Sequence, residues 1–88
     1  MDPRLETIVS YLNKVKTRCT YGVVAEVLGV NSQSVGMMLG NRRPEASWVV
    51  NSKTGDPTDY TDAEKHPDLY RTTRIIKSAE VLRRNLGL

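Results

Sequence analysis

The 88 residues are enough for one small domain over residues 1–88 and too few for two independent cores. Hydrophobic residues make up 39% of the chain and charged residues 26%, a balance typical of globular proteins rather than disordered or fibrous ones. The net charge is +3, with residues 45–70 net negative and the segments on both sides net positive. This pattern is typical of a protein that presents a cationic face to a polyanion and keeps an acidic face away from it. Charged side chains that merely solvate an exposed surface produce the same pattern.

Metal, cofactor and membrane functions find no support in the sequence. The single Cys19 has no partner for an internal disulfide, and one Cys with one His is too small a set for a zinc site. No apolar run approaches the roughly 18 residues of a membrane span. The start Met1-Asp2-Pro3 is neither basic nor followed by a hydrophobic signal region. We therefore expect a cytoplasmic protein without a cofactor, a metal or a membrane partner.

The first helix is predicted at the start of the chain. Asp2 as N-cap with Pro3 in the first turn begins it, and it runs to about Lys16. Apolar residues recur along it at helical spacing: Leu5, Ile8, Val9, Leu12 and Val15.

Two shorter helices are expected next. Thr20 caps the second, which buries a valine-rich stripe and leaves through Gly29 in a left-handed conformation. Asn31 or Ser32 caps the third, which ends at Gly40. Two short helices joined by a Gly-containing turn of about four residues have the spacing of a helix-turn-helix.

The pattern changes after Pro44. Residues 47–50 are rich in β-formers and predict a strand, and residues 51–57 predict a turn, so this part forms a short wing or a single edge strand. Residues 58–70 are acidic and polar and predict an ordered loop with one helical turn.

A basic helix is expected at the end of the chain. Ser78 caps it, although its start could lie as early as Thr72 or Thr73, and its apolar residues are Val81, Leu82 and Leu86. The predicted fold class is mainly α: a small winged helix-turn-helix domain with a short strand or wing and a C-terminal helix.

The third helix is the informative element. At 100° per residue its two faces separate into an apolar set, Val35, Met38 and Leu39, and an opposite set, Gln33, Gly36, Met37 and Gly40. A glycine inside a helix costs about 1 kcal/mol, so something should approach this nearly bare face closely. One explanation is tight packing of Gly36 against another helix of the domain. The other is a recognition helix in a nucleic-acid groove, with Arg42 and Arg43 placed for phosphates.

Residues 20–55 resemble the C-terminal DNA-binding domain of the alkylguanine-DNA alkyltransferases and their alkyltransferase-like relatives. The matches follow the family's order and spacing: Thr20, Tyr21, Gly22, Ala25, Ser34, Val35, Gly36, Leu39, Asn41, Val49, Val50, Asn51 and Gly55. The resemblance implies a winged helix-turn-helix whose second helix enters the minor groove. It also implies that Tyr21 helps to rotate a nucleotide and that Asn41 belongs to a hinge.

The departures from the family concern its chemistry. The family's Pro-Cys-His-Arg motif aligns with Glu45-Ala46-Ser47-Trp48, so the acceptor cysteine is Ala46. Alkyl transfer needs a thiolate activated by a neighbouring histidine, and we therefore expect no enzyme activity. The alkyltransferase-like relatives replace the cysteine with tryptophan but keep the His-Arg pair. The family's stack-filling arginine corresponds to Gln33, which is shorter and uncharged, so retention of base flipping is left open.

The predicted function is non-catalytic binding of duplex DNA, with the third helix in the minor groove. The expected DNA contacts are Tyr21, Asn31, Ser32, Gln33, Ser34, Gly36, Asn41, Arg42, Arg43 and Lys53. One alternative is a sensor of alkylated or damaged bases with a pocket at Ala46 and Trp48, although a lone Trp beside two valines is more often core. Another alternative is a protein-interaction module of a DNA-processing assembly, in which the bare face and Met37 dock a protein partner.

Overall fold

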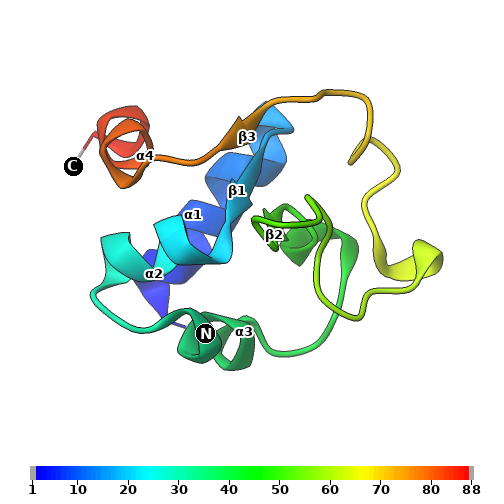
Figure 1. Cartoon of the computed structure of the whole chain (residues 1–88), viewed down its shortest axis with the longest axis horizontal. Coiled ribbons are helices and arrows are strands. Elements are labelled where there is room, and N and C mark those ends of the chain that lie inside the picture. Colours follow the sequence, from blue (N-terminus) through cyan, green and yellow to red (C-terminus); the bar gives the residue numbers. More distant parts are fainter. Residues whose placement is uncertain (1, 88) are drawn as a thin grey trace.

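Four helices and a small sheet make up the computed structural model, which describes residues 2–87 (Figure 1). The helices are α1 (Pro3–Val15), α2 (Tyr21–Leu28), α3 (Ser32–Leu39) and α4 (Ala79–Leu86). The strands are β1 (Arg18–Thr20), β2 (Val49–Val50) and β3 (Ile75–Ile76), and two short 3-10 helices are η1 (Pro44–Ala46) and η2 (Asp62–Glu64). The mainly α class is therefore confirmed.

Each α-helix begins at a cap that the sequence predicted. The side chains of Asp2, Thr20, Asn31 and Ser78 each accept a hydrogen bond from a backbone N–H of the first turn, which satisfies a donor that the helix itself leaves free. Gly29 ends α2 with φ +73°, as predicted for a left-handed exit. The spacing of α2 and α3 follows from these local signals.

The sheet differs most from the expectation. Its order is β2-β1-β3, and β1 pairs in parallel with both neighbours, with Cys19 opposite Val49 on one side and Ile76 on the other. The sequence predicted neither β1 nor β3. Because both pairings among the described residues are parallel, the turn over 51–57 does not join two antiparallel strands. Of the two expected forms, a short wing or a single edge strand, the structure has the edge strand. This strand is β2, which covers Val49–Val50 rather than the expected 47–50.

One cluster of buried residues joins the helices to the sheet. It contains the predicted apolar positions of α1 except Val15, which is exposed. Val15 is the last residue of α1, and the chain leaves the helix at Lys16 with φ 53°. Trp48 is the largest fully buried side chain, so its interpretation as a core residue is confirmed.

The last third of the chain passes from one side of the molecule to the other (Figure 1). In Figure 1, α2 and α4 lie to the left of the strands, and the long segment between β2 and β3 lies to the right. This segment contains the single predicted helical turn, η2. A start of the last helix at Thr72 or Thr73 is wrong, because β3 intervenes and α4 begins after Ser78. Within residues 2–87 there is no helix with the length and apolar content that crossing a bilayer requires.

Candidate nucleic-acid interface

The outward face of α3 carries little side-chain bulk. Val35 and Leu39 are buried, whereas Gln33, Gly36 and Met37 are exposed. A Cβ atom built on Gly36 would meet no heavy atom within 4 Å other than its own helix backbone and chain neighbours. The explanation that Gly36 is small in order to pack against another helix is therefore wrong. The face is open, and another molecule has access to the backbone there.

Two shallow depressions meet along this face. The first has a volume of about 510 Å³, and its lining consists of Tyr21, Gly22, Ser32, Gln33, Gly36, Asn51, Ser52, Lys53 and Thr58. The second has a volume of about 370 Å³, and its lining consists of Tyr21, Gln33, Gly36, Met37, Leu39, Gly40, Arg42, Thr58 and Tyr60. Four residues belong to both sets: Tyr21, Gln33, Gly36 and Thr58. We call the combined depression the α3 groove.

Tyr21 fixes one wall of the α3 groove. The backbone N–H of Thr58 donates to Tyr21 Oη over 3.3 Å, which ties the start of α2 to a loop 37 residues further along the chain. Tyr60 lies in the same wall. Partial burial raises the pKa of the Tyr60 phenol, and the nearby Tyr21 acts in the same direction against hydrogen bonding from the Arg43 backbone. Tyr60 thus offers a neutral hydroxyl group to the groove.

The turn after β2 forms the other wall and carries Lys53. The side-chain oxygen of Asn51 accepts from the backbone N–H of Lys53 at 2.8 Å, and the backbone of Asn51 bonds to Gly55 and Asp56. Gly55 adopts φ +73°, a conformation that favours glycine. These bonds hold the backbone of the turn while leaving the Lys53 side chain exposed. The structure therefore brings Lys53 to the same groove as the exposed face of α3.

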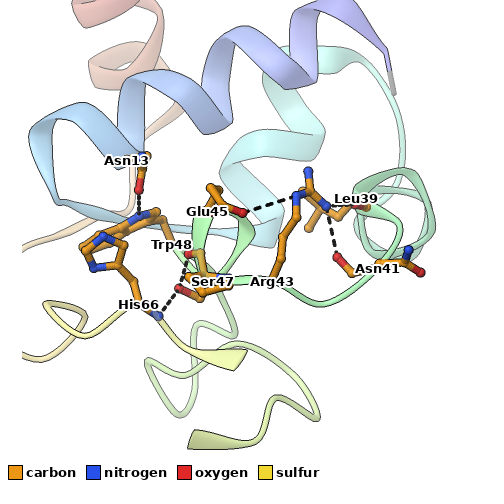
Figure 2. Close-up of polar contacts among 9 residues, drawn as sticks. Asn13, Leu39, Asn41, Arg43, Glu45, Ser47, Trp48 and His66 are labelled. Carbon is orange, nitrogen blue, oxygen red and sulfur yellow. Dashed lines mark hydrogen bonds and ion pairs between the residues drawn. The ribbon is translucent and has the colours of Figure 1, made fainter. Parts of the chain in front are cut away.

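The two arginines after α3 have different environments. Arg42 is half exposed and lies 3.8 Å from Asp59, Nη2 to Oδ2. Arg43 turns back on the helix and donates to the carbonyl oxygens of Leu39 at 2.9 Å and Asn41 at 3.0 Å (Figure 2). Arg43 thus satisfies carbonyl groups at the C-terminal end of α3, where positive charge is favourable. Arg42 is the better placed of the two for an external phosphate.

The acidic segment does not turn away from this face. Thr58 and Tyr60 line the α3 groove, and Asp59 between them pairs with Arg42. An acidic side chain therefore stands beside a candidate phosphate contact, contrary to the separation that the charge pattern suggested.

Three further candidates lie outside the groove lining. The side chain of Asn31 caps α3 by accepting from the backbone N–H of Ser34 at 2.8 Å, and Ser34 itself is half buried. Asn41 is exposed, and its carbonyl oxygen is one of the acceptors of Arg43. For these residues the structure gives a local role in ending or starting α3, and DNA contact stays a prediction.

The candidate base pocket is filled. Trp48 is 0% exposed and Ala46 is 1% exposed. The indole N–H of Trp48 donates to Asn13 Oδ1 at 3.0 Å, and its ring lies against His66 with 4.8 Å between centroids (Figure 2). The Ser47 hydroxyl, also fully buried, donates to the Pro44 carbonyl oxygen. A base would have to displace this packing to occupy the position.

The described residues contain neither a readily ionised thiol nor a group that could hold a metal ion. Cys19 is fully buried in the central strand, and burial raises the pKa of its thiol to about 12. Because the thiolate is the reactive form, burial disfavours reaction at Cys19 at neutral pH. Residues 2–87 contain no group of three or more His, Cys, Asp and Glu side chains arranged to hold a metal ion.

Comparisons of the chain with protein-family models, with curated proteins and with solved structures find no match. The resemblance of residues 20–55 to the alkyltransferase DNA-binding domain therefore stays a prediction from the sequence.

Sequence reasoning did not identify Thr58 and Tyr60 as part of the site. Both lie in the segment 58–70 that the sequence predicts as an ordered acidic loop, and their position in the groove lining depends on the long-range contact of Thr58 with Tyr21. The loop's local sequence carries no signal for that contact. The sequence places Asn51 in the predicted turn over residues 51–57, and the structure adds that its side-chain oxygen accepts from the backbone N–H of Lys53.

Proposed function

We propose that this chain is a non-catalytic DNA-binding protein whose α3 enters the minor groove of a duplex, as a helix-turn-helix. The observation that carries the proposal is the open backbone at Gly36, which lies in a groove with Tyr21 and Gln33. A minor groove is only about 6 Å wide, so a helix that enters it needs a face without bulky side chains. At Gly36 the face of α3 meets this requirement, and this glycine lowers the helix propensity of α3.

Charge on both sides of the groove supports the same function. Lys53 is exposed on the turn after β2, and Arg42 follows α3 on the other side. Phosphates flank the minor groove on both strands, and Lys and Arg side chains that neutralise them release counterions. Because the groove contains tyrosine, glutamine and serine rather than an activated nucleophile, binding without chemistry is the function that these groups favour.

A second candidate has one specific observation in its favour. Met37 is 84% exposed on the same face. Exposed methionine is common on surfaces that bind proteins. As a protein-interaction module the chain would use α3 to dock a partner and would show no affinity for DNA at low salt.

The test is a titration of a fluorescently labelled duplex at two salt concentrations. We expect binding that weakens with salt, with a slope of log K against log[salt] proportional to the phosphates contacted. The double variant Arg42→Glu with Lys53→Glu should flatten this slope by at least about two contacts. Lys14→Glu, on an exposed residue of α1 outside the groove lining, is the matched control and should change the slope far less. Absence of binding at low salt would contradict the proposal.

A further inference from the structure

Met37 projects from a helix face that is otherwise almost flat. It is 84% exposed, more than the other exposed large hydrophobic residues of the described chain, Val15 and Tyr70. Its neighbours on this face are Gln33 and Gly36, which line the same half of the α3 groove. A long apolar side chain therefore stands beside the point at which another molecule can approach the backbone.

The domain itself does not use this side chain. Val35 and Leu39 supply the buried contacts of α3, and Met38 packs partly against the core. Glutamine, lysine and glutamate have about the same helix propensity as methionine and would be better hydrated at this position. Helix formation and packing thus give no reason for methionine at position 37.

We propose that Met37 is a wedge that inserts between two stacked base pairs from the minor groove and kinks the duplex. This inference rests on the proposed function. Proteins that bind the minor groove often insert an apolar side chain between base steps, which bends the DNA toward the major groove by about 20–90°. Methionine is among the residues used, because its unbranched thioether fits an irregular apolar gap and buries no polar group.

The geometry of the groove favours Met37 over Gln33 as the inserted residue. Gln33 lines both halves of the groove, where its amide can reach base edges or the walls. Inserted into a stack, that amide would lose hydrogen bonds with water without equivalent replacement, which is costly. Met37 lines only the half that also contains Arg42. A kink at Met37 would therefore lie on the side where Arg42 can meet the phosphate backbone.

The experiment uses a duplex labelled at both ends with a fluorescent donor and acceptor, and a second duplex with 2-aminopurine at single positions. Wild-type protein should shorten the end-to-end distance by an amount that fits a bend of at least about 20°. It should also raise 2-aminopurine fluorescence at one step, because unstacking relieves quenching. Met37→Ala should abolish both signals and weaken binding about tenfold, the effect of losing one buried methionine side chain. Met37→Leu should retain both signals.

Val15→Ala is the matched control, because it also shortens an exposed apolar side chain but lies at the end of α1, outside the α3 groove. It should leave bending and affinity unchanged. If wild-type protein binds no duplex, the proposed function fails. If it binds while the DNA stays straight and stacked, or if Met37→Ala keeps the bend, the proposed function stands and the wedge is wrong. An unaltered DNA affinity in Met37→Ala would likewise contradict the wedge.

Discussion

The guanidinium group of Arg18 donates a hydrogen bond to the carbonyl oxygen of Gly55, with 3.0 Å between Nη1 and O. A second bond, 2.8 Å from Nη2, reaches the carbonyl oxygen of Thr72. Arg18 is only 8% exposed, so one buried side chain in the central strand holds both the turn after β2 and the segment before β3. Since that turn carries Lys53, Arg18 positions a wall of the α3 groove.

Replacing Arg18 should therefore destabilise the fold. Arg18→Met keeps much of the aliphatic bulk but leaves two partly buried carbonyl oxygens without their donor, and we expect a loss of about 2 kcal/mol in the free energy of unfolding. Urea unfolding followed by Trp48 fluorescence measures the loss. Arg74→Met, at an exposed position, is the control and should stay within about 0.5 kcal/mol of wild type. Equal losses in the two variants would contradict the role of Arg18.

Stability should fall at acidic pH partly through Asp68. The hydrogen bond from the Lys16 ammonium group, 3.1 Å away, holds the pKa of the Asp68 carboxyl below its ordinary value. The unfolded chain then binds a proton at higher pH than the folded chain, near the ordinary value of about 3.9. The contribution is complete above that pH and disappears as pH falls through the lower, folded-state pKa.

An NMR titration of the Asp68 carboxyl measures this shift directly. Lys16→Met should move the pKa of Asp68 up toward its ordinary value, and Asp68→Asn should make stability less dependent on pH in the acid range. If Lys16→Met leaves the titration of Asp68 unchanged, the ion pair is not the cause of the shift.

No alkyl group should transfer to the protein. Ala46 offers no nucleophile, and burial raises the pKa of the Cys19 thiol to about 12. Intact mass after incubation with alkylated DNA should stay unchanged, and iodoacetamide should modify Cys19 only after urea is added. A gain of one alkyl group by the folded protein would overturn the non-enzymatic interpretation.

Asp59 should limit DNA affinity, since it pairs with Arg42 beside the α3 groove. Asp59→Asn removes the negative charge, and asparagine tolerates the positive φ of 59° at this position. We expect binding of a duplex to tighten about two- to fivefold at low salt, the range of an exposed charge pair. Asp62→Asn, on the exposed first position of η2, is the control and should have a smaller effect. Unchanged affinity in Asp59→Asn would place Arg42 away from the DNA.

The sequence predicted those parts of the fold that depend on neighbouring residues. Asp2, Thr20, Asn31 and Ser78 each cap a helix within the next three residues, so their signal is local. The parallel sheet was missed because its strands are two or three residues long and pair across large separations. Arg18, a charged residue buried in the central strand, contradicts the usual pattern of such strands.

In the candidate site too, the parts set by neighbouring residues were predictable and the parts set by long-range contacts were not. The bare face of α3 follows from helical periodicity, so Gln33, Gly36 and Met37 were placed on it correctly. The wall that contains Thr58 and Tyr60 was not predictable, because it depends on the hydrogen bond between Tyr21 and Thr58. Arg43 was assigned to phosphate, whereas its bonds to the end of α3 depend on a backbone path that the sequence does not specify.

Thermal melts and duplex titrations of Gly36→Ala and Gly36→Gln test whether α3 enters the minor groove. Because a Cβ at Gly36 meets open space, both variants should fold, and Gly36→Ala should raise stability by up to about 1 kcal/mol. The longer Gly36→Gln side chain would occupy the minor groove and should abolish DNA binding while the melt stays unchanged or rises. Gly36→Gln that binds a duplex as tightly as wild type would contradict the entry of α3 into the minor groove.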